Sequence, residues 1–311
     1  MRPGAAVGIN HQFATPLPKP PMKAVWLPWL GTGGAVCIGV LLALAGSDGG
    51  GLAFGVPAFA LCVALAFVVQ WVAFVPAYLK RTERFFDLIG ASTFVLVACV
   101  ALVGAGEFGV RGVVIALLVG VWAVRLGVFL ALRVRAGGDR RFDAIKPSFA
   151  LFLMTWTLQA VWVCVSFGPG IVAIASVGEA GADAFLLAGA ALWVAGFVIE
   201  VVADEQKRRF RGKPENTHRF IDSGLWAWSR HPNYLGEIVL WLGIAVAAFP
   251  ALRGWQYATL VSPVFVWLLL TRISGVRMLD GAAAKRWAGV DAYADYVANT
   301  PMLLPRPPRR P

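Results

Sequence analysis

Apolar residues in this chain gather in long blocks, separated by short polar or charged stretches. Most blocks approach or exceed the roughly 20 residues that a helix needs to cross the hydrocarbon core of a bilayer. This pattern predicts an all-α polytopic transmembrane bundle of seven or eight spans, because in lipid a helix satisfies its own backbone polar groups. The blocks lie at about 25–46, 52–79, 86–104, 112–134, 148–177, 184–203, 234–250 and 256–272.

The fifth block is longer than one span needs, and it contains the Gly-Pro-Gly sequence at 168–170. Proline inside a helix removes a backbone hydrogen bond and bends or breaks the helix. We therefore expect either a kinked helix or a helix followed by a re-entrant segment. Gly189 and Gly196, inside the sixth block, are expected to mark places where two helices pack closely.

Composition supports a membrane protein. Of the 311 residues, 59% are hydrophobic and 14% are charged, whereas soluble domains average about 45–50% apolar and about 25% charged residues. A soluble globular enzyme and a disordered chain are both excluded. The four cysteines lie in separate apolar blocks without a Cys-x-x-Cys pair, so neither a metal site nor a disulfide framework is expected.

The net charge of +11 is typical of nucleic-acid binding until the positions of the charges are considered. With a cytoplasmic N-terminus, 25 of the 28 lysines and arginines fall on the cytoplasmic side. Only Arg111 and Arg253 lie in outside loops, and Arg125 lies within a span. Short cytoplasmic loops are enriched in lysine and arginine. We therefore predict an integral protein of the bacterial inner membrane, with both termini cytoplasmic and no nucleic-acid partner.

Four regions follow from these boundaries. They are an N-terminal cytoplasmic tail (1–24), N-terminal transmembrane helices (25–147), a C-terminal membrane domain (148–305) and a basic tail (306–311).

Polar residues concentrate in one segment, from Glu200 to Trp241. Five charged residues at its start recur at spacings of three and four, so they form one stripe if the sixth span continues beyond the membrane. Gly212 and Pro214 would end that helix. The stripe consists of Glu200, Asp204, Lys207, Arg208 and Arg211.

The seventh helix is expected to begin at Pro232, a residue that suits a first helical turn. Asn233 and Glu237, four residues apart, then share one face, and the free N–H groups of the helix start suit a phosphate. Arg125 either snorkels towards the interface or pairs with a buried acid or a ligand phosphate. The whole basic segment could instead bind anionic lipid headgroups.

The stretch SRHPNYLGE at 229–237 resembles the signature of a bacterial membrane family of uncharacterised function. That family is related to the C-terminal domain of steroid 5-alpha-reductases. The resemblance covers roughly 185–305, including FIDSGLW at 220–226 and the late pair Tyr293 and Tyr296. It implies a polytopic helical fold that holds NADPH in a cytoplasm-facing cavity between helices, without a Rossmann domain.

The resemblance also implies which residues hold the cofactor. They lie on the helix before the signature, in the connector, in the signature itself and near the C-terminus. They are Asp204, Arg211, Arg219, Arg230, His231, Asn233, Tyr234, Glu237 and Tyr296.

The implied reaction is hydride transfer from NADPH to an electron-poor C=C bond of a lipid-soluble substrate, for example a steroid-like one. In steroid reductases a tyrosine and a glutamate of the early spans hold the substrate carbonyl. Trp122 and Asp87 fall at these positions here and are the catalytic candidates. An indole donates one hydrogen bond but cannot supply a proton, so the sequence departs from the family at the tyrosine.

A second resemblance leaves other functions open. Isoprenylcysteine and phospholipid methyltransferases share the RHPxY-G pattern and bind S-adenosylmethionine at a similar place. Many of them carry two adjacent glutamates in the last helix, where this chain reads MLDG at 278–281. A membrane methyltransferase and a non-catalytic lipid-binding protein remain the alternatives to a reductase.

Overall fold

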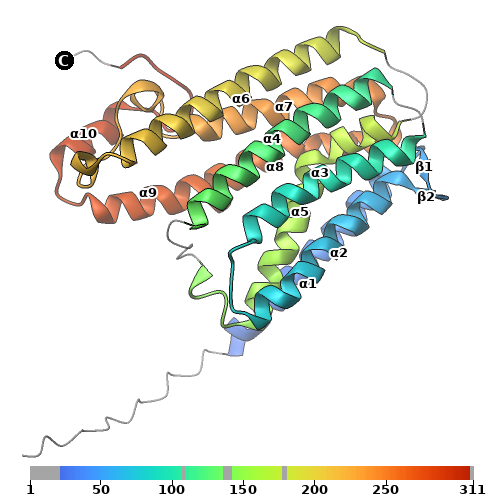
Figure 1. Ribbon diagram of the computed structural model, residues 1–311, viewed down its shortest axis with the longest axis horizontal. Coiled ribbons are helices and arrows are strands. Elements are labelled where there is room, and N and C mark those ends of the chain that lie inside the picture. The colour runs from blue at the N-terminus through green and yellow to red at the C-terminus, as the bar shows by residue number, and fades with distance from the viewer. Residues whose placement is uncertain (1–21, 107–108, 136–141, 177–180, 309–311) are drawn as a thin grey trace, which may run out of the picture.

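The computed structural model describes residues 22–106, 109–135, 142–176 and 181–308. It shows an all-α polytopic bundle with one two-stranded hairpin between the first two helices (Figure 1). The α-helices and strands are α1 (Met22–Gly46), β1 (Leu52–Ala53), β2 (Val56–Pro57), α2 (Ala58–Leu79), α3 (Phe86–Ala105), α4 (Val110–Arg135), α5 (Phe149–Ala175), α6 (Ala184–Arg211), α7 (Pro232–Ala248), α8 (Ser262–Leu268), α9 (Gly275–Arg286) and α10 (Asp291–Asn299). Short helical turns lie at Pro214–Asn216, Gly224–Ala227, Phe249–Ala251, Gly254–Val261 and Leu269–Ile273.

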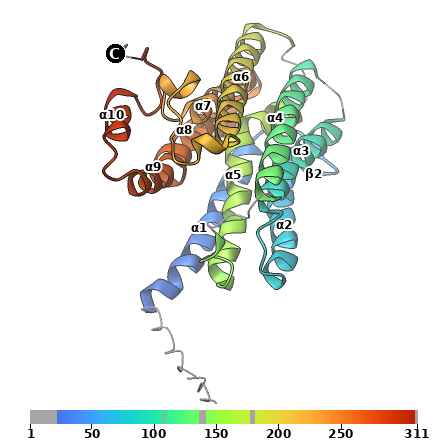
Figure 2. The ribbon, with the colours of Figure 1, turned by 60° about the vertical axis from the view of Figure 1, so that its left-hand side comes forward.

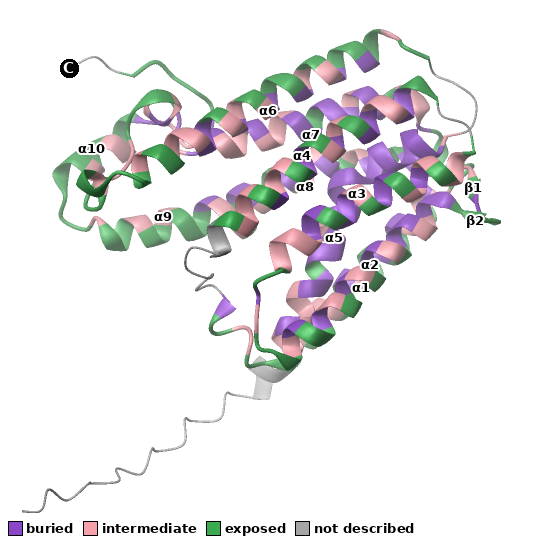
Figure 3. Cartoon of the chain, viewed as in Figure 1, coloured by how far each residue is buried: buried purple, intermediate pink, exposed green. Residues whose placement is uncertain are grey.

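In the described part of the chain, eight helical segments are long and apolar enough to cross a membrane. This confirms the predicted bundle and decides between seven and eight in favour of eight. Exposed residues lie along the outward faces of these helices (green in Figure 3), and many of them are large and apolar. Such a surface suits lipid, because soluble monomers rarely expose continuous apolar patches of this extent.

Helix α5 is the central helix of the bundle. In its apolar window 89% of the residues are buried, and it contacts α1, α2, α3, α4, α7 and α8 (Figures 1 and 2). It continues through Pro169 without a break, so of the two expectations for this block the re-entrant segment is wrong. Neighbouring helices surround the proline and can accommodate the backbone group that it frees.

Glycines bring α6 and α7 into direct backbone contact. A Cβ at Gly196 would lie 2.5 Å from the carbonyl oxygen of Gly236, and one at Gly189 would lie 2.5 Å from that of Gly243. Real Cβ atoms do not approach backbone this closely, so each pair requires glycine on both helices. The predicted packing role of Gly189 and Gly196 is confirmed.

The eighth segment is longer than the apolar block that predicted it. It runs from Gly254 to Arg286, through a π turn at Leu269–Ile273, into the polar helix α9. The side chain of Ser274 donates to the carbonyl of Leu269 at 3.0 Å within this turn. The apolar pattern ends at the π turn, but the helical segment continues into α9. This helix can be polar because it carries its charges outside the packed bundle.

Several segments of the C-terminal half lie together at one end of α6 and α7. We call residues 212–231, between α6 and α7, the connector. The connector, α9 and α10 lie together at this end, away from the β1–β2 hairpin at the opposite end of the bundle (Figures 1 and 2).

Candidate functional site

An arginine within a span joins two acids of the polar stripe. Arg125 on α4 donates from Nη1 to Glu200 Oε1 and from Nη2 to Asp204 Oδ2, each at 2.5 Å. The side chain of Arg125 is 19% exposed and that of Glu200 is 4% exposed. Arg125 therefore pairs with buried acids of α6 and does not snorkel to the interface.

Each of these two carboxylates accepts a second hydrogen bond. The indole Nε1 of Trp122 donates to Glu200 Oε2 at 3.2 Å, and the amide of Asn233 donates to Asp204 Oδ1 at 3.1 Å. Three helices thus converge on one polar centre, which we call the carboxyl cluster. Its members are Trp122, Arg125, Glu200, Asp204, Asn233 and Glu237.

The close packing of α6 on α7 positions this cluster. A Cβ at Gly236 would lie 2.6 Å from the backbone nitrogen of Glu200, so Glu200 sits directly against the first turns of α7. Asn233 and Glu237 then face α6 and α4, because they are four residues apart on one side of α7. Burying a carboxylate here is tolerable only with such partners.

Aromatic rings close the cluster on its inner side. The ring of Trp122 lies 4.9 Å from that of Trp241 and 5.1 Å from that of Phe94. All three residues are completely buried. The polar centre is therefore bounded inside the bundle by apolar aromatic surface, and its polar continuation runs along α6 towards the connector.

Two residues of the signature form a second ionic contact, away from the carboxyl cluster. Arg230 Nη1 donates to Asp280 Oδ2 at 2.9 Å, and His231 Nε2 lies 2.9 Å from Asp280 Oδ1. Tyr234 stacks on His231, with ring centroids 5.5 Å apart. These side chains fasten the start of α7 to α9, which is a structural role in the arrangement seen here.

The connector is held by backbone contacts with the C-terminal segment. Tyr296 donates its phenol hydrogen to the carbonyl of Trp226 at 2.8 Å, and Trp226 Nε1 donates to the carbonyl of Ala203 at 3.0 Å. Burial raises the pKa of Tyr296 above its usual range. The phenol therefore stays protonated and keeps donating at neutral pH. The backbone N–H of Arg230 also bonds the carbonyl of Pro301 at 2.9 Å.

The two remaining cofactor candidates lie at the surface. Arg211, in the last turn of α6, and Arg219, in the connector, are both exposed. Arg211 follows Asp204 by two helical turns, or about 10 Å along the axis. The stripe along α6 therefore changes from buried carboxylates to exposed cations as it leaves the bundle.

Of the catalytic candidates, the structure places only Trp122 in the cluster. Asp87 is partly buried in the first turn of α3. It precedes Phe94, whose ring contacts Trp122, by seven residues, or about 10 Å along the helix. Nearby, Ala91 and Leu88 approach Gly127 on α4, which puts Asp87 beyond Arg125 towards the exposed ends of both helices.

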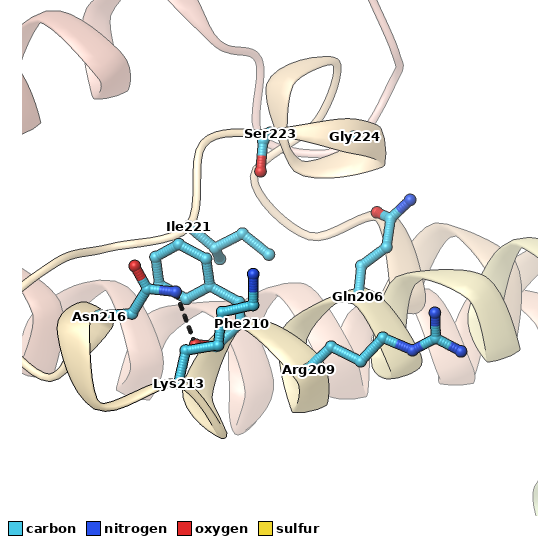
Figure 4. Close-up of a pocket in the computed structure, with 8 residues that line it drawn as sticks. All are labelled: Gln206, Arg209, Phe210, Lys213, Asn216, Ile221, Ser223 and Gly224. Carbon is cyan, nitrogen blue, oxygen red and sulfur yellow. Dashed lines mark hydrogen bonds between the residues drawn. The ribbon is translucent and has the colours of Figure 1, made fainter.

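A surface cavity of about 360 Å³ lies beside α6, on the side of the helix away from the carboxyl cluster (Figure 4). Gln206 and Phe210 line it from α6, and Ser223 faces them from the connector. At 100° per residue these α6 positions point away from the side that carries Glu200 and Asp204. The cavity is therefore distinct from the carboxyl cluster.

Sequence reasoning selected four members of the cluster and left out two. Asp204, Asn233, Glu237 and Trp122 are among the predicted site residues, whereas the sequence leaves Arg125 open between snorkelling and pairing, and places Glu200 only in the charged stripe. Charge inside an apolar block was the signal for both, since such residues rarely occur in spans without a partner. Asp280 is the hydrogen-bond partner of Arg230 and His231. The sequence drew attention to its segment, 278–281, only because the adjacent glutamates of the methyltransferases are missing there.

Comparison with known proteins gives a family and distant relatives. The family described as "Protein of unknown function (DUF1295)" matches residues 73–300. The chain is 34% identical over 76 residues to 3-oxo-5-alpha-steroid 4-dehydrogenase 1 of Bos taurus, covering 24% of this chain and 29% of the relative. It is 36% identical over 72 residues to the Mus musculus protein of the same name, covering 23% and 28%.

A relative with a different named activity also matches. The chain is 29% identical over 109 residues to "Probable O-methyltransferase ustE" of Ustilaginoidea virens, covering 35% of this chain and 36% of that protein. The chain thus spans about a third or less of the length of these relatives. No solved structure matches significantly.

Proposed function

The chain belongs to the DUF1295 family, and from this premise we propose that it is an NADPH-dependent membrane reductase of a C=C bond in a lipid-soluble substrate. The observation that carries the proposal is the carboxyl cluster, at the point where a polar stripe meets apolar spans. The relatives named 3-oxo-5-alpha-steroid 4-dehydrogenase support the reaction class. Their name describes dehydrogenation of a 3-oxo steroid at position 4, which is the reverse of reducing a C=C bond there.

The polar stripe fits the charge distribution of NADPH. Arg211 and Arg219 at the exposed end suit phosphates, because guanidinium groups bind them with paired hydrogen bonds. Asp204, about 10 Å deeper along α6, and Asn233, which bonds it from α7, suit the ribose hydroxyls and the carboxamide, which are neutral donors and acceptors. The order of charges along the helix therefore matches the order of groups along the dinucleotide.

When bound, NADPH would supply the hydride, which leaves positive charge on the nicotinamide ring. Glu200 and Asp204 would favour that charge electrostatically, since both are fixed by Arg125 before any reaction takes place. Fixed groups aimed at developing charge are a large source of catalysis. The aromatic surface of Trp122 and Trp241 would exclude water from the inner side of the site.

We propose a cytoplasmic location for this end of the bundle, with both termini cytoplasmic in an inner membrane. The distribution of lysine and arginine supports it, because 25 of 28 would lie on that side. A soluble cofactor would then enter from the cytoplasm, and the substrate would come from the bilayer.

A methyltransferase is the second candidate, and one observation favours it. The described cluster contains three carboxyl groups and one guanidinium, a surplus that would also attract the positive sulfonium of S-adenosylmethionine. The fungal relative named as a probable O-methyltransferase points the same way.

Isotope transfer separates these functions. Purified protein in proteoliposomes would be supplied with NADPH deuterated at the transferring position and with a 3-oxo-4-ene steroid, or with a bacterial lipid extract. Deuterium in a saturated lipid product, detected by mass spectrometry, is the expected result. Transfer of a labelled methyl group from S-adenosylmethionine, without deuterium transfer, would contradict the reductase.

A further inference from the structure

The carboxyl cluster contains an imbalance that the fold does not neutralise. In the described part of the chain, Glu200, Asp204 and Glu237 interact with one another and with a single cation, Arg125. Arg125 lies on α4, the first two acids lie on α6, and Glu237 lies on α7. Three ionised carboxylates would leave two uncompensated negative charges within the spans.

The hydrogen-bond donors are divided unevenly among the three acids. Arg125 gives one N–H to Glu200 and another to Asp204, and each of these acids receives one further donor, from Trp122 and Asn233 respectively. Donors stabilise the ionised form of a carboxyl group. Glu200 and Asp204 are therefore the two acids to which the cluster supplies its hydrogen-bond donors.

Glu237 receives no hydrogen bond from any residue that the structure describes. It lies between Asn233, which bonds Asp204, and Trp241, whose ring contacts Trp122. All three residues share one face of α7 at spacings of four. Glu237 therefore faces two carboxylates, and the arginine beside them donates its hydrogen bonds to those two neighbours. It is also less buried than Glu200.

From this geometry we infer that Glu237 carries a proton at neutral pH and supplies it to the substrate during the reduction. The inference rests on the proposed function for its second half only. The C=C bond gains a hydride at one carbon and the Glu237 proton at the other, so its π bond is replaced by two C–H bonds. NADPH loses two electrons with the hydride, and Glu237 becomes a carboxylate that water then reprotonates. This supplies the proton donor that Trp122 cannot be.

The protonation state can be measured without turnover, by infrared difference spectroscopy of purified protein in nanodiscs between neutral and alkaline pH. We expect a protonated-carboxyl band at neutral pH that disappears in Glu237→Gln. It should persist in Glu205→Gln, because Glu205 is an ionised surface acid paired with Arg208 and Arg209. Absence of the band in the wild type, or its survival in Glu237→Gln, would overturn the inference.

A stability measurement guards against misfolding of the variant. Glutamine has the shape of a protonated glutamate, so the Tm of Glu237→Gln at neutral pH should lie within about 2 °C of the wild-type value. A change of about 1 kcal/mol in stability typically shifts the Tm of a large domain by about 2–4 °C. A large loss of stability would show an ionised, partnered Glu237 and would refute the inference.

The catalytic half is tested by turnover with deuterated NADPH and the 3-oxo-4-ene steroid. Glu237→Gln should bind NADPH normally, but its kcat should fall at least tenfold. The wild-type rate should decline at high pH, and the variant should lack this decline. An unchanged kcat and pH profile would refute the donor role. If the wild type bound no NADPH, the proposed function would fail while the infrared band would still stand.

Discussion

Replacing Arg125 with glutamine tests the physical basis of the carboxyl cluster. The substitution removes two charge-assisted hydrogen bonds, from Arg125 to Glu200 and to Asp204. Each such bond contributes about 1.5–3 kcal/mol, and breaking a buried ion pair by removing one partner costs about 3–5 kcal/mol. The guanidinium is 19% exposed, so we take the lower end, about 3 kcal/mol.

The assay is thermal unfolding of purified protein in detergent. For a large domain, about 3 kcal/mol corresponds to a fall in Tm of about 6–12 °C. The matched control is Arg208→Gln, which removes an ion pair with Glu205 at the surface of α6 and should leave Tm nearly unchanged, because exposed ion pairs contribute little. Two further results are expected. The deficit of Arg125→Gln should shrink at acidic pH, where protonation neutralises the stranded acids, and adding Glu200→Gln should restore part of the lost stability.

A loss of stability in Arg125→Gln no larger than that in Arg208→Gln would refute this reasoning. It would show that the acids gain their compensation elsewhere, and the electrostatic role proposed for Glu200 and Asp204 would lose its support. An unchanged deficit at acidic pH would contradict the argument in a second way, because the cost would then not come from stranded charge.

Three other predictions concern the framework. Gly236→Ala should destabilise the protein by about 1–3 kcal/mol in unfolding assays, because its Cβ would lie 2.5 Å from a backbone oxygen, whereas Gly120→Ala, with open space around it, should be neutral or stabilising. Asp183 caps α6 through the N–H of Leu186, and this bond lowers its pKa. Its contribution is therefore present above the unfolded pKa and lost as pH falls through the lower folded value. Asp183→Ala should lower Tm at neutral pH while Asp183→Asn keeps most of the cap, and equal Tm values for the two variants would contradict the capping role. Tyr296→Phe should cost about 0.5–1.5 kcal/mol, and an unaltered unfolding midpoint would show that its bond to the connector contributes nothing.

The spans could be predicted because their signal is local. Each apolar block is read from consecutive residues, and the ends of α6 and α7 follow from Gly212 and Pro232 at their boundaries. The shared face of Asn233 and Glu237 also needs only helical spacing. The sequence around Pro169 could not decide between a kinked helix and a re-entrant segment. The effect of this proline depends on the helices packed around α5, which a local pattern does not contain.

The partners within the site could not be predicted in the same way. Arg125 meets Glu200 across 75 residues of sequence, and Arg230 meets Asp280 across 50. Neither spacing has a helical or strand period, so only the packing of α4, α6, α7 and α9 brings the pairs together. The sequence leaves both snorkelling and pairing open for Arg125, and the fold shows that it pairs with Glu200 and Asp204.

We propose that the stripe from the carboxyl cluster to the exposed arginines binds a dinucleotide. Side-by-side equilibrium titrations of the purified protein with NADPH and with S-adenosylmethionine test it most directly. We predict saturable NADPH binding that Asn233→Ala weakens at least tenfold, equivalent to about 1.4 kcal/mol. Lys213→Ala, which alters the cavity on the other side of α6, should leave NADPH binding unchanged. Binding of S-adenosylmethionine without NADPH, or NADPH binding that ignores Asn233 and depends on Lys213, would contradict the claim.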